Sequence, residues 1–490
     1  MGKRVISLII VALLLCSVCT AVSCADNKNP VKTGTLNTGK TGAVTETDDK
    51  FYGFDPLPKL SGAEGFNLIG YTRGPESGYT AWNTVDFYAE ETTEEAINDS
   101  VYDRNEQLKT KYGFTVSQVI SPKEQFDQAV ASINSEDDAF NVIVADGQVS
   151  AALGQGGYLV DLKTVPYLTL EGPWWDQHAN EQLSIANKLY FTTGDLSISA
   201  NDATWICTYN KVVQEEQNVE DLYQLVRDNK WTIDKVQEIN KSISTDLNDD
   251  GKRDVNDKYG YIYEPFNNYA LFYSLGQSIT KKNKDDIPEL SVYSAASAEV
   301  FEIIRGISDD KIDYFIDWST PCTAIIKDNR ALMTSTTMYT VRANYRAWEQ
   351  DFGILPMPKL TEDQPYVDVV STATCGSLYS IPKSNKELDL TGYALEAFCR
   401  ESKDTLRVAY YDLTITHKTM RDPESAEMMD IILANRYFDM AIIYNWGGWY
   451  QYFYNLWGTS GSNFASTYES AKDKTIAEIN TTVDEFLKSN

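Results

Sequence analysis

A regular alternation of strand and helix patterns between residues 64 and 150 constrains the fold of this 490-residue chain most strongly. Short apolar runs predict three buried strands, at 67–72, 114–120 and 139–147. Apolar side chains at helical spacing predict helices between them, over 92–112 and from Pro122 onward. Strands that alternate with helices in this way form a parallel α/β sheet. Ligands of such sheets bind beyond the carboxyl ends of the strands, where Asp146 and Gln148 follow the third strand.

A second α/β series follows along the chain. Apolar runs, two of them stopped by proline, predict further strands at 203–211, 352–359 and 375–383. Thr232 is a typical N-cap for a helix, and 391–400 forms another. The last segment, 466–488, is predicted to be a helix with one apolar stripe, formed by Ile476, Ile479, Val483, Phe486 and Leu487.

The charge balance excludes one class of partner. Asp and Glu number 71 against 43 Lys and Arg, so the formal net charge is -28. This charge repels phosphate backbones, and we expect no nucleic acid partner. The only histidines, His178 and His417, are too few for a histidine-based metal or catalytic centre. Aromatic residues make up 12% of the chain, which suits either a sugar-binding site or a tyrosine-rich core and surface.

The N-terminus has the pattern of an export signal. Lys3 and Arg4 precede the apolar run 5–15, which is too short for a permanent membrane span and fits a signal peptide over 1–23. Small or β-branched residues precede Cys24, as in a bacterial lipobox, so Cys24 is predicted to be lipidated. The alternative is ordinary cleavage with release of the protein. The next residues, 24–63, contain few large apolar side chains and predict a flexible tether to a lipid anchor.

Four cysteines lie in the remainder of the chain: Cys207, Cys322, Cys375 and Cys399. They are far apart and show no CxxC spacing, so a disulfide framework is not indicated. Buried free thiols are the favoured interpretation, although one pair could oxidise outside a cell.

The order of several segments resembles the extracellular solute-binding proteins of family 1, the carbohydrate-type receptors of bacterial ABC importers. The matching segments are FNVIVADG, GGYLVDL, ANKLYFTTGDL, ATWICTYNKVV, WTIDKVQEI, FGILPMPK and CGSLYSIPKSNKELDLTGYALEAFC. Each segment alone is a weak signal, whereas seven in the family's order are a strong one.

The resemblance implies a two-lobed α/β fold of the type II periplasmic-binding-protein-like class, with parallel and mixed sheets flanked by helices and a cleft between the lobes. It divides the chain into a first lobe of 64–194 with 353–385 and a second lobe of 195–352 with 386–490. It implies a monomeric receptor without catalytic residues that binds a small saccharide and delivers it to ABC permease subunits. Hinge closure around the ligand accompanies binding in this class.

The resemblance also implies ligand contacts. The residues of this chain that fall at the family's ligand-contact positions are Asp146, Gln148, Asn201, Asp202, Glu264, Phe266, Tyr339, Trp446 and Trp449. Tyr79 and Trp82 are further candidates from the first lobe. Aromatic rings would stack on sugar C–H faces and the polar groups would bind hydroxyls, which suits a neutral polyhydroxylated ligand. For each residue the alternative is core packing or surface exposure, and for Asp146 it is a helix N-cap.

Residues 246–257 read DLNDDGKRDVND and predict a structural calcium site. The oxygen donors fall at the positions of an EF-hand-like loop, in the order Asp246, Asn248, Asp250, Lys252 through its carbonyl, Asp254 and Asp257. Gly251 stands at the bend. The alternative is a solvated acidic turn without a metal.

Two other classes of protein share this composition. A secreted glycoside hydrolase is also acidic and rich in aromatic residues, but it needs a pair of catalytic carboxylates at a defined separation. A surface glycan-binding or adhesion lipoprotein would more often contain repeated all-β modules, which the sequence lacks. Turnover of an oligosaccharide would identify the hydrolase, and binding without turnover the receptor.

Overall fold

The structure is a computed structural model that describes residues 51–75, 82–122, 125–264, 266–309, 314–315, 321–371, 373–411, 423–456 and 463–488. The chain divides into two units, residues 1–49 and 50–490, and every described residue belongs to the second. The predictions for the signal peptide, for Cys24 and for Tyr79 therefore lie outside the described residues. None of the described helices is both long and apolar enough to cross a membrane.

The first sheet has four strands in the order β12-β3-β1-β2. Its strands are β1 (Asn67–Arg73), β2 (Thr115–Ser121), β3 (Val142–Ala145) and β12 (Leu378–Ser380). The three early strands pair in parallel, as the alternation of strands and helices predicts, and β12 adds an antiparallel partner to β3. Ala145, the last residue of β3, is followed directly by Asp146 and the helix that it caps.

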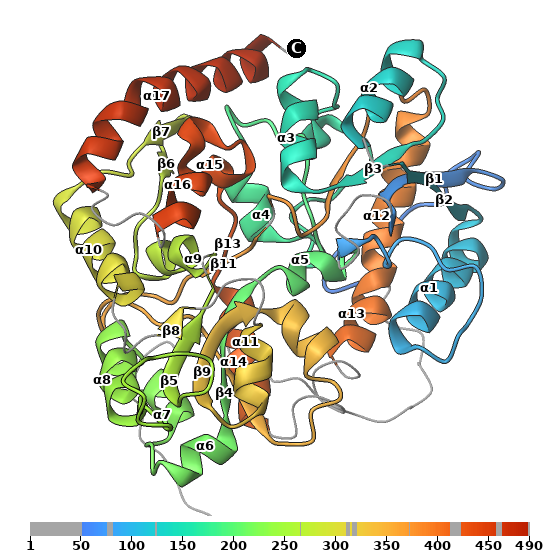
Figure 1. The fold of residues 1–490 in the computed structure, drawn as a ribbon. Coiled ribbons are helices and arrows are strands. Elements are labelled where there is room, and N and C mark those ends of the chain that lie inside the picture. The colour runs from blue at the N-terminus through green and yellow to red at the C-terminus, as the bar shows by residue number, and fades with distance from the viewer. Residues whose placement is uncertain are drawn as a thin grey trace, which may run out of the picture. The chain divides into compact units, whose positions relative to one another are not determined.

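Helices of the expected kind accompany this sheet (Figure 1). They are α1 (Ala96–Tyr112), α2 (Gln125–Ser135), α3 (Gly147–Gln155) and α12 (Leu388–Asp404). Gly113 ends α1 because its φ of 86° is a left-handed conformation that glycine adopts without a steric penalty. Asp146 caps α3 by accepting a hydrogen bond from the Val149 N–H at 3.0 Å.

The second sheet has five strands in the order β10-β4-β9-β5-β8. They are β4 (Trp205–Asn210), β5 (Tyr259–Tyr263), β8 (Tyr314–Phe315), β9 (Ala331–Thr337) and β10 (Phe352–Leu355). β4 pairs antiparallel with β9 and with β10, whereas β5 pairs in parallel with β8 and β9. The sheet is therefore mixed, as the resemblance implies.

The remaining elements follow the chain order. Early helices are η3 (Leu162–Thr164), α4 (Gln177–Gln182), α5 (Ile198–Asp202), α6 (Lys211–Glu216), α7 (Leu222–Arg227), α8 (Ile233–Ile243) and α9 (Asn267–Ser274). Later helices are α10 (Ala295–Asp309), α11 (Cys322–Lys327), η4 (Thr340–Asn344), α13 (Leu406–Val408), α14 (Pro423–Ala434), α15 (Met440–Ile443), η6 (Trp446–Gly448), α16 (Trp449–Asn455) and α17 (Phe464–Lys488). Two small sheets pair β6 (Thr280–Lys282) with β7 (Pro288–Leu290), and β11 (Asp368–Val369) with β13 (Arg436–Tyr437).

The sheet pairings differ from the predicted lobe boundaries. β10 was assigned to the first lobe through the range 353–385, yet it pairs with β4 in the second sheet. The range 386–490 was assigned to the second lobe, yet α12 packs along α1 and β1. Strand pairing and helix packing depend on contacts between distant segments, so the linear order of motifs does not reveal these exchanges.

The predicted tether also ends earlier than residue 63. Phe51 and Phe54 form a pair of backbone hydrogen bonds, and the Phe54 ring packs against Trp174 with centroids 5.1 Å apart. Tyr52 donates a hydrogen bond to Asp404 at 2.8 Å. Residues 51–63 therefore belong to the folded part of the chain.

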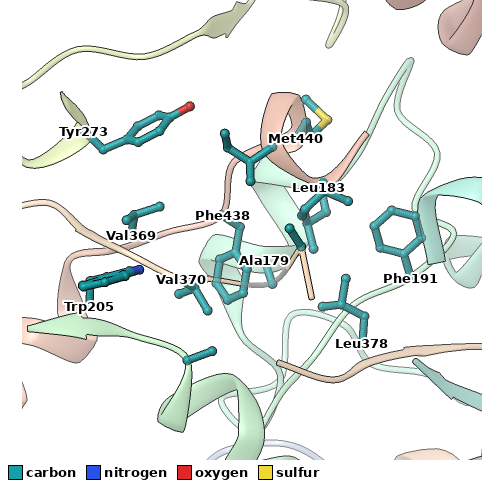
Figure 2. Packing of buried hydrophobic residues seen from close by; sticks show 14 of the residues in the cluster. Ala179, Leu183, Phe191, Trp205, Tyr273, Val369, Val370, Leu378, Phe438 and Met440 are labelled. Carbon is teal, nitrogen blue, oxygen red and sulfur yellow. The ribbon is translucent and has the colours of Figure 1, made fainter. Parts of the chain in front are cut away.

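One hydrophobic core connects the two sheets. Figure 2 shows part of it, where Trp205 of β4 and Leu378 of β12 belong to the same cluster as Tyr273 of α9. The C-terminal helix α17 buries Ile479, Val483 and Phe486, while Ile476 and Leu487 of the predicted stripe are exposed. The four cysteines Cys207, Cys322, Cys375 and Cys399 are free thiols, and all except the half-buried Cys375 are buried.

Candidate functional site

A cavity of about 400 Å³ lies between residues of the second sheet and the segments that follow β1 and precede β12. This volume is within the usual range for small-molecule sites. The lining consists of Trp82, Trp205, Glu264, Phe266, Pro321, Cys322, Thr323, Thr334, Ser335, Thr336, Thr337, Tyr339, Thr340, Asn344, Ser371, Thr374, Cys375 and Tyr450. Aromatic rings and hydroxyls dominate this set.

Aromatic side chains form two pairs in the wall of the cavity. Trp82, which follows β1, contacts Tyr339, which follows β9, with ring centroids 5.0 Å apart. Phe266, at the start of α9, stacks on Tyr450 of α16 at 6.3 Å with an interplanar angle of 17°. Ring faces of this kind bind the C–H faces of sugars and other flat apolar surfaces.

Hydroxyl groups of β9 form another part of the lining. The strand is buried from Ala331 to Ser335 and then presents Thr336 and Thr337 at intermediate exposure. Thr336 and Thr340 hydroxyls are hydrogen-bonded to each other at 2.7 Å, and Ser335 is bonded to Tyr261 at 2.6 Å. Hydroxyls donate and accept, so this strand can match a ligand that carries several hydroxyl groups.

Glu264 is the one carboxylate among the described residues that line the cavity. Burial raises its pKa above the ordinary value, and a hydrogen bond from the Cys322 backbone N–H opposes that shift. No Lys, Arg or His is present among the described lining residues. The described lining therefore offers one carboxyl group, which accepts hydrogen bonds when ionised and can also donate one when protonated. It offers no positively charged side chain.

Arg73 is not a lining residue of the cavity, but it forms hydrogen bonds to three residues that are. Its guanidinium donates to the carbonyls of Trp82, Thr374 and Cys375 at 2.8, 3.0 and 2.6 Å. It also pairs with Asp146 at 3.0 Å, and Arg73 itself is only 3% exposed. One buried side chain at the end of β1 thus fixes two loops that line the cavity.

A second cavity, of about 360 Å³, lies beside Glu181 and Lys282. Of its two lysines, Lys282 is already engaged, because its Nζ donates to Asp286 at 2.7 Å and to Ser184 at 2.9 Å. The cavity lined by β9 is the better candidate for a ligand site.

The structure brings together four of the predicted ligand contacts. Glu264, Phe266 and Tyr339 all line the cavity, and Trp82 completes the set. They come from three separate segments of the chain, since only Glu264 and Phe266 are close in sequence, so the convergence of these segments is not a consequence of sequence proximity.

Four other predicted contacts do not line this cavity. Asp146 caps α3 and pairs with Arg73, and the Gln148 backbone N–H donates to the Ala373 carbonyl at 3.0 Å. Asn201 accepts a hydrogen bond from Arg436 and lies at a different pocket. Asp202 is buried, pairs with Arg342 at 2.6 Å and accepts from Tyr410 at 3.0 Å. The side chains of Asp146, Asn201 and Asp202 thus contact other groups of the protein, whereas the contact of Gln148 is made by its backbone.

Trp446 and Trp449 are corrected from ligand contacts to core residues. Each is only 1% exposed. The Trp446 indole donates to Thr482 at 3.0 Å and the Trp449 indole donates to Thr475 at 3.1 Å, both on α17. Neither lines the cavity, whereas the neighbouring Tyr450 does.

Several lining residues were missed by the sequence analysis. They include Trp205, Thr323, Asn344, Tyr450, the segment around Ser371 and Cys375, and the hydroxyl run Thr334–Thr337. The run of four consecutive hydroxyl residues at the end of an apolar strand was a usable signal, because a purely structural strand would bury apolar side chains there. The other residues had no distinguishing local pattern.

The loop 246–257 has several features of a calcium-binding turn. Gly251 has a φ of 75°, and its N–H donates to Asp246 at 2.9 Å. Asp250 accepts from the Lys252 N–H at 2.8 Å, and Asp257 accepts from Leu247 and Asp254 N–H groups at 3.0 and 2.9 Å.

The metal-binding function of this loop stays a prediction. The second oxygen of Asp246 is buried without a hydrogen-bond partner, which suits a cation ligand. However, no group of three or more His, Cys, Asp or Glu side chains is arranged to hold a metal ion within the residues that the structure describes.

Comparison with known proteins gives a clear result only at the level of structure. No model of a known protein family matches the sequence, and no curated protein matches it. Among solved structures, an ABC substrate-binding protein from Listeria monocytogenes in complex with cycloalternan has a TM-score of 0.56 and 12% identity, covering 85% of this chain and 99% of that chain.

Two further structures agree. The extracellular solute-binding protein from Staphylococcus aureus in complex with maltose has a TM-score of 0.57 and 13% identity, covering 85% of this chain and 98% of that chain. The cyclic α-maltosyl-1,6-maltose binding protein from Arthrobacter globiformis has a TM-score of 0.58 and 13% identity, covering 84% of this chain and 98% of that one. The chain therefore has the two-lobed α/β fold of these binding proteins.

Proposed function

We propose that this chain is an extracytoplasmic receptor that binds an oligosaccharide and delivers it to an ABC importer. The observation that carries the proposal is the cavity lined by the contacting rings of Trp82 and Tyr339 and by the hydroxyls of β9. This combination of ring faces and hydroxyls suits a sugar, which has both C–H faces and hydroxyl groups. Solved proteins of the same fold are described as complexes with cycloalternan and with maltose, which adds support.

The same cavity favours a receptor over a glycoside hydrolase. A hydrolase positions two carboxyl groups on either side of the scissile bond. Among the described lining residues Glu264 is the only carboxylate. We therefore infer that the protein binds its ligand without cleaving it.

Titration calorimetry of the purified protein against a panel of oligosaccharides, with chromatography of each mixture after incubation, tests this proposal. We expect saturable binding to at least one saccharide and recovery of that saccharide intact. Cleavage of the bound saccharide would identify a hydrolase, and the lack of binding to every saccharide would overturn the receptor function.

We also propose that a lipid on Cys24 tethers the protein to the outer face of the cytoplasmic membrane, where it functions as a monomer beside the permease subunits. The apolar run 5–15 and the small residues before Cys24 support this location. Replacement of Cys24 by Ala should release the protein into the medium or block its processing. Membrane retention and unchanged processing of that variant would contradict the anchor.

A further inference from the structure

Among the described residues that line the cavity, Glu264 is the only carboxylate, and none of them is a cation. We propose that the saccharide bound here carries a free amino group, protonated in the complex, and that Glu264 is the counter-ion of that group. This inference rests on the proposed receptor function and specifies the chemical class of the ligand.

A buried carboxylate such as Glu264 is costly unless it has a partner. An ionised carboxylate removed from water loses its hydration and needs a partner to compensate. Glu264 receives one backbone hydrogen bond, from Cys322, and its pKa is raised by burial. Besides burial, its negative charge in turn raises the pKa of the Cys322 thiol and of the Tyr345 hydroxyl, neither of which carries positive charge.

The two guanidinium groups near the cavity, those of Arg342 and Arg73, are already paired with carboxylates. Arg342 lies over the Tyr339 ring at 5.4 Å, but its charge is held by Asp202 at 2.6 Å. Arg73 reaches the cavity wall only through backbone carbonyls and pairs with Asp146. Lys327, whose ammonium group donates to the Asn344 carbonyl and lies 5.5 Å from the Tyr345 ring, is not a lining residue. None of the described lining residues thus supplies a cation for Glu264, which points to the ligand as its source.

The other residues that line the cavity suit a sugar that carries an amino group. An ammonium group is attracted to the faces of aromatic rings, and Trp82, Phe266, Tyr339 and Tyr450 contribute such rings to this cavity. The hydroxyls of Thr334–Thr337 remain to bind the hydroxyls of the sugar. A neutral saccharide would use the rings and hydroxyls but would leave Glu264 without a counter-charge.

Three β-1,4-linked disaccharides with one skeleton test the inference: the glucosamine disaccharide, its N-acetylated form and cellobiose. The first carries free amines, the second neutral amides and the third only hydroxyls. We measure their affinities by calorimetry below the pKa of the amine, and we expect the glucosamine disaccharide to bind at least tenfold more tightly than the other two.

The Glu264→Gln variant is the matched control, because glutamine keeps the size and hydrogen-bonding capacity of the side chain but not its charge. It should lose the preference for the amine, so that the ratio of its affinities for the glucosamine disaccharide and for cellobiose falls to about one, whatever the affinity for cellobiose itself. Circular dichroism establishes that the variant is folded.

A measurement on the wild-type protein is independent of that variant. Burial raises the pKa of Glu264 in the empty cavity and pairing with an ammonium group would lower it, so binding at a pH where the carboxyl is partly protonated should release protons. The calorimetric enthalpy for the glucosamine disaccharide should then depend on the ionisation enthalpy of the buffer, and the enthalpy for cellobiose should not.

The possible results separate the two proposals. Equal affinities for the three disaccharides, or tighter binding of cellobiose, would overturn the amine inference and leave the receptor function intact. A preference for the amine that survives in a folded Glu264→Gln variant would also overturn it. If these disaccharides and the wider oligosaccharide panel all fail to bind, the receptor function and this inference fall together.

Discussion

Two regions of this molecule are rich in aromatic side chains, and they differ in what their polar atoms contact. In the cavity, Trp82 and Tyr339 face each other beside the hydroxyls of β9 and the carboxylate of Glu264. In the C-terminal aromatic cluster, Trp446 and Trp449 are covered by α17, and both indole N–H groups donate to threonines of that helix.

The difference shows how a ligand-binding ring is distinguished from a structural one. A buried indole requires an acceptor for its N–H group, and the protein itself supplies that acceptor in the C-terminal aromatic cluster. The rings of the cavity instead lie beside open volume, hydroxyls and a carboxyl without a counter-charge. The C-terminal aromatic cluster should therefore determine stability, and the cavity should determine affinity.

Replacement of Trp449 by Ala tests the structural side of this comparison and has the largest expected effect. The ring is 1% exposed and packs against Tyr452 and Phe464, with centroids 5.6 and 6.3 Å away. Loss of a buried tryptophan costs about 3–5 kcal/mol of unfolding free energy, measured by urea denaturation. The saccharide affinity of the remaining folded protein should not change, and a clear loss of affinity would return Trp449 to the ligand site.

Replacement of Asp439 by Asn tests the same region through pH. Asp439 is buried at the start of α15, where it accepts hydrogen bonds from Tyr273 and from the Ala441 N–H, and burial raises its pKa to about 7. The native state therefore holds this proton more tightly than the unfolded state, whose carboxyl titrates near pH 4. The contribution of Asp439 to stability is present below pH 4 and is lost as the pH rises to about 7.

The Asp439→Asn variant cannot lose that proton, so its stability should not show this decrease. Between pH 4 and pH 8 we expect the stability of the variant relative to the wild type to rise by roughly 4 kcal/mol, since the pKa differs by about three units between the two states and each unit corresponds to about 1.4 kcal/mol. Urea denaturation of both proteins across this pH range measures the difference. Parallel pH profiles would show that Asp439 titrates normally.

The sequence predicted the elements of the fold better than their grouping. The alternation over 64–150 correctly indicated β1, β2 and β3 as parallel neighbours, and Thr232 caps α8 as expected. Local patterns determine such elements. β10 pairs with the second sheet and α12 packs against the first, opposite to the predicted lobes. These placements follow from contacts with distant segments, which a single sequence does not display.

Only part of the candidate site was predicted, because its residues also come together through contacts between distant segments. Glu264, Phe266 and Tyr339 were identified through the resemblance, and all three line the cavity. Trp446 and Trp449 belong to a segment of similar composition, and only the positions of Thr475 and Thr482 on α17 reveal their structural role. Arg73 was missed because its partners Trp82, Thr374 and Cys375 are close in space and not in sequence.

Replacement of Tyr339 by Ala tests the cavity side of the comparison. The ring contacts Trp82 and lines the cavity, so its loss should weaken saccharide binding by roughly 1–2 kcal/mol, about the value of one aromatic contact and its buried area. Calorimetry measures the affinity. Tyr293→Ala is the matched control, because Tyr293 is a partly exposed tyrosine that stacks on Tyr468 at 4.7 Å and does not line the cavity.

Equal affinities of the two tyrosine variants would remove Tyr339 from the ligand site. A large loss of stability in Tyr339→Ala would instead place this ring with the structural aromatic residues. Either result would contradict the distinction between a ligand-binding cavity and a structural aromatic cluster.

The smallest expected effect concerns the loop 246–257, which belongs to neither aromatic region and which we propose binds calcium. A ligand that binds only the native state stabilises it by mass action, so free calcium at three times its dissociation constant should add about 0.8 kcal/mol. Thermal denaturation with and without calcium measures this shift, and magnesium at the same concentration is the ionic control. Saccharide affinity should be unaffected, because no residue of the loop lines the cavity.

The loop provides its own matched pair of variants. Asp250 stands at an oxygen-donor position of the predicted site, whereas Asp249 stands between two donor positions and has a φ of 57°, which asparagine adopts readily. Both changes to Asn remove one negative charge, so they alter the general electrostatics of the loop equally. Only Asp250→Asn should reduce the calcium-dependent shift, because it replaces a charged ligand of the ion by a neutral oxygen donor. A shift of equal size in both variants would indicate nonspecific screening of an acidic turn, and no shift in the wild type would eliminate the calcium site.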